Sequence, residues 1–202
     1  MLAGVVLAAG ASSRMGQPKA LLHIGRETCL SRILRSVRAV AGNRAIVTVA
    51  RGDRNILGHI DLRYYRVLEN ARPPAAEQIG SIQTAIESVI NLPVEAAIVW
   101  PVDHPVVTEG TVRNLAAAFL RSRRPVVMPV FRGHRGHPVV LSRVVFGELL
   151  SAPPAEGAKA VVRRDGARIL EVEVEDPGVV EDIDCPADYA RLLGRLGSDT
   201  AS

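Results

Sequence analysis

A stretch near the N-terminus, LAAGASSRMGQPKALL, places two cations, Arg14 and Lys19, after a loop of small side chains. Gly, Ala and Ser let backbone N–H groups converge on an anion, so this loop is a candidate phosphate cradle. Of the 25 basic residues only Lys19 and Lys159 are lysines. A compact ammonium on a flexible stem fits sites that the wide, planar guanidinium of Arg does not, so Lys19 is a candidate phosphate-binding residue. The alternative is a surface Lys retained by chance.

A lone carboxylate, Asp103, directly follows the apolar run AAIVWPV. Packing gives no reason for a charge there, and Pro101 and Pro105 hold the surrounding loop stiff. Because Mg²⁺ prefers one or two carboxylates together with phosphate oxygens, Asp103 is a candidate metal ligand. The alternative is that Asp103 caps the next helix, a task for which Thr108 is better placed.

Other polar residues follow later elements of the chain. We expect Asn70 to end a strand, and Gly80 and Ser81 to open the next helix, where Ser81 could also be a simple cap. His134 and His137 are three residues apart without an adjoining Cys or carboxylate, which does not favour a metal pair.

Short runs of Val, Ile and Leu alternate with helical patterns along most of the chain. This alternation predicts an α/β fold with a doubly wound, mostly parallel, Rossmann-like sheet, whose ligands bind outside the carboxyl ends of the strands. We expect strands over 3–8, 44–50, 64–69, 96–102 and 124–130, and helices over 27–40, 77–90, 108–122 and 141–150.

Beyond residue 136 the alternation loosens. The sequence ARILEVEVEDPGVVEDID, residues 167–184, predicts a small β-hairpin subregion, and a last helix is expected from Pro186 to Leu193. We expect a single domain over residues 1–196 and a disordered tail over 197–202.

The composition excludes several classes of protein. Hydrophobic residues make up 48% of the 202 but aromatic residues only 3%, which is typical of a Val-, Leu- and Ile-rich sheet covered by helices. The formal charge is +4, yet the Arg residues are scattered, so we expect a small anionic ligand and no nucleic acid. Two cysteines without metal spacing suit a reducing compartment. Since no signal-peptide pattern and no membrane-spanning stretch is evident, we expect a cytoplasmic protein.

The opening stretch is neither a Walker loop, because Lys and a hydroxyl residue do not follow its second Gly, nor a GxGxxG loop. It resembles the LAAGxSxRMGxxKxLL signature of the NTP-transferase superfamily, which has a nucleotide-diphospho-sugar-transferase-like fold. Its Ala-Ala-Gly form, the following PKALL and the chain length are most similar to the molybdenum cofactor cytidylyltransferases. The related guanylyltransferases usually carry Leu-Ala-Gly-Gly.

The resemblance implies residues for the nucleotide. Asn70, Gly80 and Ser81 match a stretch that contacts base and ribose, although Glu77 stands where the family usually has Gly. The loop that wraps the triphosphate, with the two cations that meet its phosphates, would be Leu7, Ala8, Ala9, Gly10, Arg14 and Lys19.

The resemblance also implies residues for a metal and an acceptor. Asp103 matches the Asp-x-Pro motif, and Asp182 and Asp184 match a closing motif that lends Mg²⁺ a second carboxylate, with Cys185 in place of the usual Thr. Asp184 could equally cap the last helix. The acceptor residues would be His137, from the Gly-His-Pro motif, and Lys159.

The activity implied is nucleotidyl transfer from an NTP, with CTP favoured, to a phosphate-bearing acceptor, with molybdopterin favoured, and release of pyrophosphate. A molybdoenzyme or its chaperone is a further expected partner. Transfer from GTP, transfer to a sugar or alcohol phosphate, and a nucleotide- or pterin-binding protein without transferase activity stay open as alternatives.

Overall fold

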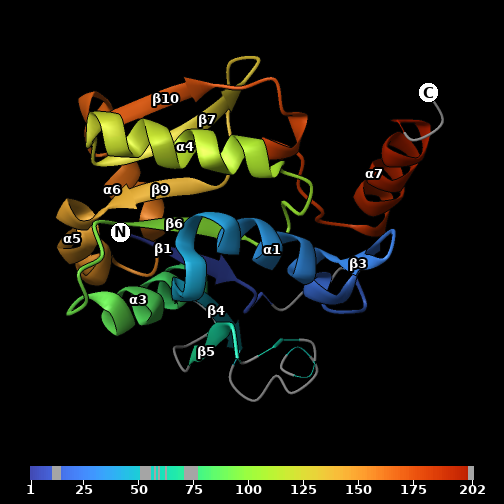
Figure 1. Cartoon of the computed structure of the whole chain (residues 1–202), viewed down its shortest axis with the longest axis horizontal. Coiled ribbons are helices and arrows are strands. Elements are labelled where there is room, and N and C mark those ends of the chain that lie inside the picture. The colour runs from blue at the N-terminus through green and yellow to red at the C-terminus, as the bar shows by residue number, and fades with distance from the viewer. Residues whose placement is uncertain are drawn as a thin grey trace.

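The computed structural model describes residues 1–10, 15–50, 56, 58, 60–61, 63–70 and 77–199 (Figure 1). The described residues form one eight-stranded sheet in the order β10-β7-β9-β6-β1-β4-β5, with β8 paired to β7. Most neighbours are parallel, while β9 runs antiparallel to β6 and β7, and β8 antiparallel to β7. The strands are β1 (Leu2–Leu7), β4 (Ala45–Ala50), β5 (Tyr65–Asn70), β6 (Ala96–Pro101), β7 (Val126–Phe131), β8 (His134–Arg135), β9 (Val139–Ser142) and β10 (Ile169–Glu173).

Helices follow the strands in the chain order expected of a doubly wound fold, which confirms the predicted fold class. A two-stranded antiparallel ribbon, β2 (His23–Ile24) and β3 (Glu27–Thr28), precedes the first helix. The helices are α1 (Cys29–Ala41), α3 (Glu77–Val89), α4 (Glu109–Ser122), α5 (Phe146–Ser151), α6 (Gly157–Arg163) and α7 (Pro186–Asp199), and the 3₁₀ turns are η1 (Lys19–Leu21), η2 (Gly42–Arg44), η4 (Arg143–Val145), η5 (Gly166–Arg168) and η6 (Pro177–Val179).

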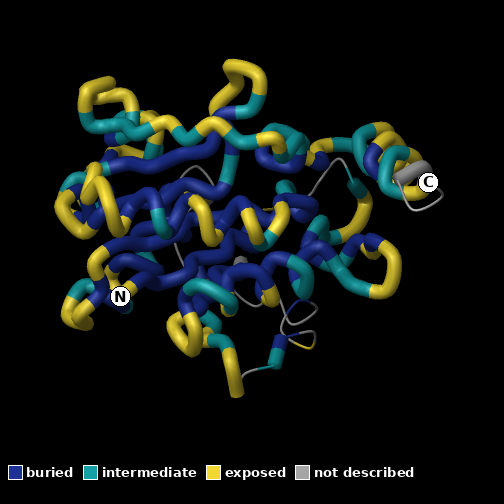
Figure 2. The backbone as a smooth tube through the Cα atoms, turned by 45° about the horizontal axis from the view of Figure 1, so that its top comes forward, coloured by how far each residue is buried: buried dark blue, intermediate teal, exposed yellow. Residues whose placement is uncertain are grey.

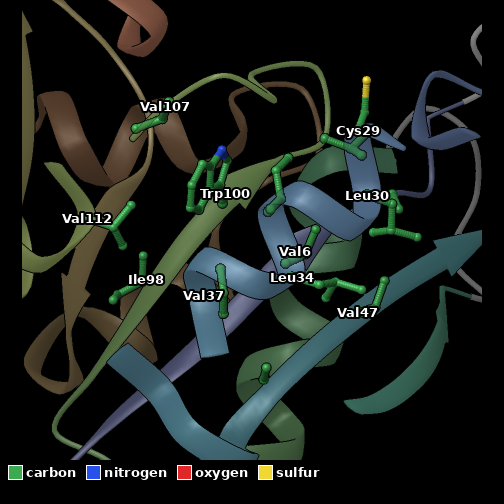
Figure 3. Close-up of a cluster of buried hydrophobic side chains, with 14 of the residues drawn as sticks. Val6, Cys29, Leu30, Leu34, Val37, Val47, Ile98, Trp100, Val107 and Val112 are labelled. Carbon is green, nitrogen blue, oxygen red and sulfur yellow. The ribbon is translucent and has the colours of Figure 1, made fainter. Parts of the chain in front are cut away.

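The sheet is buried on both faces, which is why its central strands read as continuous apolar runs. Alternate residues of β1 enter different cores: Val6 packs with residues of α1 and α4, whereas Val5 packs with residues of α3, α5 and α6. Figure 3 shows Val6, Trp100 and Leu34 within the first core, and Figure 2 shows buried backbone running through the middle of the molecule, with α7 mostly outside it. Among the described residues, no helix is long and apolar enough to cross a membrane.

The close approach of α1 to β1 depends on a missing side chain at Gly4. A Cβ there would lie 2.0 Å from Val37 Cγ1. We expect Gly4→Ala to lower the free energy of unfolding by about 1–3 kcal/mol, because overpacking forces side chains and backbone apart. Urea denaturation measures this. The control is Gly147→Ala in α5, where no atom outside the adjoining backbone of the helix lies within 4 Å of the new methyl group. Equal stability of the two variants would contradict the expectation.

Two predictions about the later part of the chain are wrong. The hairpin over 167–184 is absent: β10 instead pairs in parallel with β7, and the segment after it forms the 3₁₀ turn η6 rather than a second strand. Its alternating pattern and its Asp-Pro-Gly sequence are those of a hairpin, but the partner of the strand is distant in sequence. The helix expected over 141–150 begins only at Phe146. Residues 141–142 complete β9, a short strand buried between β6 and β7, and residues 143–145 form the 3₁₀ turn η4.

The end of the chain also differs from expectation. The last helix does not stop at Leu193 but continues to Asp199. Residues 197–199 of the expected tail are therefore helical, and residues 200–202 lie outside the described residues.

Candidate active site

The carboxyl ends of β1 and β6 lie side by side at the centre of the sheet, where the strand order reverses. Leu7 pairs with Pro101, and the backbone N–H of Val102 donates to the carbonyl of Leu7 at 3.0 Å, so the two following loops leave the sheet together. Leu7, Ala8 and Ala9 are buried and Gly10 is exposed. In doubly wound sheets this switch point is where ligands bind.

Lys19 begins the turn η1 and reaches across the switch point. Its ammonium lies 2.6 Å from Asp184 Oδ1 and 3.9 Å from Asp103 Oδ2, with 15% of the side chain exposed. Ala20 beside it is buried and anchors the turn. The structure therefore brings together three predicted residues from distant segments, whereas Arg14 lies outside the described residues.

The loop that carries Asp103 is fixed by the residues around it. Trp100, a fully buried side chain, donates its indole N–H to the carbonyl of His104 at 2.9 Å, across the turn that holds Asp103. The carbonyl of Asp103 itself accepts the N–H of Ile183 at 3.0 Å. Thr108, not Asp103, caps α4 by accepting the N–H of Thr111, so the cap alternative for Asp103 is excluded.

Asp103 sits in surroundings that disfavour its charge. Burial raises the pKa of its carboxyl group, an effect that the ammonium of Lys19 opposes. The described residues contain three buried side-chain polar atoms without a hydrogen-bond partner: Asp103 Oδ1, His104 Nδ1 and His137 Nδ1. All three belong to one cluster. Because buried polar atoms are normally paired, a cluster of unpaired ones marks a place for a ligand.

The two histidines of this cluster face each other. Their ring centroids are 4.8 Å apart, and His104 Nε2 lies 3.8 Å from Asp103 Oδ1. Burial lowers the pKa of both rings, that of His137 to about 4, so both are neutral at physiological pH. They line a pocket of about 440 Å³ together with Val179 and Asp182. His104 occupies the variable position of the Asp-x-Pro motif, so no sequence signal singled it out.

The predicted base-contacting residues meet at the end of β5, two strands away from β1. Asn70, the last residue of β5, is buried and donates from Nδ2 to Ser81 Oγ at 3.1 Å. Because α3 begins at Glu77, Gly80 and Ser81 lie inside the helix rather than at its opening. The prediction that they open the helix is wrong, and so is the alternative that Ser81 caps it.

The closing motif delivers one carboxylate to Lys19 and another to the pocket. Asp184 forms the ion pair described above, and Asp182 lines the pocket beside the histidines. Asp188, which sequence reasoning missed, accepts the backbone N–H groups of Asp184 at 3.1 Å and Cys185 at 2.9 Å, as well as the Cys185 thiol at 3.1 Å. These bonds, led by that of the thiol, lower the pKa of Asp188 to about 2. The spacing Cys185-x-x-Asp188 is that of a capping box, the signal that could have found it.

Lys159 and Cys29 interact electrostatically with residues of this cluster. Lys159 is exposed on α6, yet its charge is among the causes that lower the pKa of His137. Cys29 is fully buried with its pKa raised to about 12 by burial, which makes its thiol a poor nucleophile.

The carboxylates of Asp103 and Asp184 suit a hard cation that is also coordinated by phosphate oxygens. The described residues hold no group of three or more His, Cys, Asp or Glu side chains able to bind a metal alone. Asp103 and Asp184 both lie within ion-pair distance of the Lys19 ammonium, and one buried oxygen of Asp103 has no hydrogen-bond partner. Mg²⁺ commonly takes one or two carboxylates and completes its shell with water and substrate phosphates.

A family model described as a MobA-like NTP transferase domain matches residues 4–169. The chain is 25% identical over 192 residues to the molybdenum cofactor cytidylyltransferase of Escherichia coli K12, covering 92% of each chain. It is 26% identical over 196 residues to the molybdenum cofactor guanylyltransferase of Rhodobacter capsulatus, covering 96% of each.

A solved structure extends the likeness to three dimensions. The complex of Rv0371c from Mycobacterium tuberculosis H37Rv with manganese has a TM-score of 0.74 and 27% identity, with 96% of this chain and 98% of that chain covered. The family resemblance recognised in the opening loop is confirmed by the family model.

Proposed function

We propose a specific nucleotidyl transfer for this chain, which belongs to the MobA-like NTP transferase family, a family of nucleotidyltransferases. The donor is CTP, the acceptor is a molybdopterin-type phosphate, and the products are the cytidylylated acceptor and pyrophosphate. The observation that carries the proposal is the meeting of Lys19, Asp103 and Asp184 at the switch point of the sheet.

The choice of donor rests on Ala9 in the opening loop. Leu-Ala-Ala-Gly is the form of the cytidylyltransferases that the chain resembles, whereas the guanylyltransferases usually have Gly in place of this Ala. The chain is about equally identical to one curated enzyme of each kind, 25% and 26%, so overall identity does not favour either donor. Transfer from GTP is therefore the second candidate function.

The proposed reaction is a displacement at the α-phosphorus. An oxygen of the acceptor phosphate forms a bond to that phosphorus, the bond to the bridging oxygen of the β-phosphate breaks, and pyrophosphate leaves with the electron pair. A phosphate is already ionised at neutral pH, so no protein base is needed to activate it. The task of the protein is positioning and charge stabilisation.

Residues of this chain supply the fixed charges. Lys19 would leave its carboxylate partners in part and approach the α-phosphate, and Arg14 would approach the departing pyrophosphate. Asp103 and either Asp184 or Asp182 would hold Mg²⁺, which when bound neutralises charge on the phosphate oxygens. The relative Rv0371c was solved with manganese, a cation of similar ligand preference.

The histidine pocket would hold the acceptor. Because His104 and His137 are neutral, they offer hydrogen bonds without adding charge beside the reacting phosphates. Lys159 lies close enough to act electrostatically on His137 and would meet an outer acidic group of the acceptor.

A nucleotide panel tests the donor assignment. We expect CTP with Mg²⁺ to raise the melting temperature more than GTP, ATP or UTP, and to be the nucleotide from which pyrophosphate is released when a molybdopterin acceptor is present. A larger response to GTP would replace CTP by GTP as the donor. Nucleotide binding without pyrophosphate release from any NTP would instead identify a binding protein without transferase activity.

A further inference from the structure

One segment of the chain, residues 176–184, contacts the loop of Asp103, the loop of His137 and the side chain of Lys19. It lies between β10 and α7 and begins with the turn η6. We call it the crossing segment. Figure 1 shows that it leads from the β10 side of the sheet towards α7.

The crossing segment is anchored at its start by the carboxylate of Asp176. Oδ2 accepts the backbone N–H of Thr108 at 2.8 Å, the hydroxyl of Thr108 at 2.9 Å and the hydroxyl of Thr111 at 2.7 Å. Oδ1 accepts the N–H of Gly178 at 3.0 Å. A carboxylate with four donors at the N-terminus of α4 is a strong attachment, because charged hydrogen bonds and the helix dipole both favour it.

The middle of the segment is joined to two site loops through its backbone. The carbonyl of Val179 accepts the N–H of His137 at 2.8 Å, and the N–H of Ile183 donates to the carbonyl of Asp103 at 3.0 Å. The packing is close on both sides: a Cβ on Gly136 would lie 2.2 Å from the carbonyl oxygen of Val179, and a Cβ on Gly178 would lie 2.8 Å from the carbonyl oxygen of Val106. A shift of the segment would therefore move the loops of Asp103 and His137 with it.

The end of the segment carries Asp184 to Lys19. The 2.6 Å ion pair between them is held from behind by Asp188, which accepts the N–H groups of Asp184 and Cys185. The segment is thus fixed at both ends by aspartates: Asp176 binds the N-terminus of α4, and Asp188 lies in the first turn of α7.

We propose that Asp176 is a positioning residue for nucleotidyl transfer: it fixes the crossing segment on α4 and thereby sets the positions of Asp103, His137 and Asp184. The inference rests on the transfer function proposed above. Asp176 touches none of these three side chains in the contacts described, so its effect passes through the backbone of the segment.

The chain offers a matched control for Asp176. Asp165 stands before β10 as Asp176 stands after it, and its Oδ1 accepts the N–H of Ala167 at 2.8 Å, two residues on, as Asp176 does with Gly178. Both aspartates cap a 3₁₀ turn, η5 and η6 respectively. Only the turn capped by Asp176 belongs to the crossing segment.

The first measurement is amide hydrogen exchange in Asp176→Ala and Asp165→Ala. We expect Asp176→Ala to speed exchange of the amides of His137 and Ile183, whereas Asp165→Ala speeds exchange only near Ala167. Unchanged exchange at His137 and Ile183 in Asp176→Ala would overturn the proposal, whatever the activity of the variant.

The second measurement compares Mn²⁺ affinity and transfer kinetics in the folded variants. We expect Asp176→Ala to weaken Mn²⁺ binding, followed by electron paramagnetic resonance, and to lower kcat/KM about 10–100-fold, the range found when groups that orient metal ligands are removed. Asp176→Asn, which keeps one acceptor oxygen, should recover part of both, and Asp165→Ala should match the wild type.

Wild-type Mn²⁺ affinity and kinetics in Asp176→Ala, despite faster exchange, would also overturn the proposal. Faster exchange and weaker Mn²⁺ binding in a protein whose wild type transfers no nucleotide would support the positioning role of Asp176 and refute the proposed function.

Discussion

Asp103→Asn is expected to slow transfer strongly while leaving the fold intact or more stable. We expect kcat/KM to fall about 10³-fold, because the carboxylate proposed to hold Mg²⁺ is lost, a metal ion contributes several kcal/mol of transition-state stabilisation and each 1.4 kcal/mol is tenfold in rate. Initial rates of pyrophosphate release, with CTP varied from below saturation at a fixed acceptor concentration, measure the effect.

The expected gain in stability follows from the raised pKa of Asp103. A carboxyl whose pKa is higher in the folded than in the unfolded state stabilises the fold below its unfolded pKa, and this contribution is lost as pH rises through the folded pKa. At pH 7 without metal the charged, partly desolvated Asp103 therefore disfavours folding, and Asn does not. Thermal unfolding in EDTA should give Asp103→Asn a melting temperature at or above that of the wild type.

Asp165→Asn serves as the control for both measurements, since Asp165 caps a turn outside the site. It should leave transfer unchanged. A stable Asp103→Asn that retains transfer within a few-fold of the wild type would remove Asp103 from the metal site. A variant that merely unfolds would contradict the stability argument instead.

The parts of the fold that are local in sequence could be predicted from it. The strands that end at Leu7 and Pro101 are buried on both faces and read as apolar runs, and α4 begins behind the expected cap Thr108. The β10 and β9 strands could not be placed in this way. Their partners are chosen by tertiary packing, so the alternating pattern predicts a hairpin, and the last two residues of the four-residue buried run fall within a predicted helix.

The same distinction holds for the candidate site. Lys19, Asp103 and Asp184 could be singled out because each has an unusual residue type at a strand end or within a motif, and the structure brings them together. Asp176 could not, because its partners Thr108 and Thr111 are more than sixty residues away. Sequence spacing identifies the groups that could bind a ligand more readily than the groups that hold them in position.

Lys19 gives the prediction that separates charge from geometry. We expect Lys19→Met to lower kcat/KM about 10²–10³-fold, the loss found when one fixed donor to a developing negative charge is removed. Lys19→Arg keeps the charge but places a wide planar group where 15% of the side chain is exposed, so we expect a loss of at least about tenfold. Full activity in Lys19→Arg would mean that any cation suffices.

Mn²⁺ binding without nucleotide should change in the opposite direction to transfer. The ammonium of Lys19 lies between Asp103 and Asp184, the carboxylates proposed to hold the metal, and so repels an incoming cation. Two unit charges about 4 Å apart interact by about 4 kcal/mol at an effective dielectric of about 20. Removing the Lys19 charge should therefore let Lys19→Met bind Mn²⁺ at least about tenfold more tightly.

Arg113→Met, which breaks the exposed ion pair with Glu109 on α4, should change neither quantity. A residue that only supports the fold would lower Mn²⁺ affinity and transfer together when it is replaced. Tighter metal binding with slower transfer would therefore identify Lys19 as a cation that acts on the phosphates. Before the nucleotide binds, the charge of Lys19 would be balanced by the carboxylates that later hold the metal. Weaker Mn²⁺ binding in Lys19→Met would contradict that assignment.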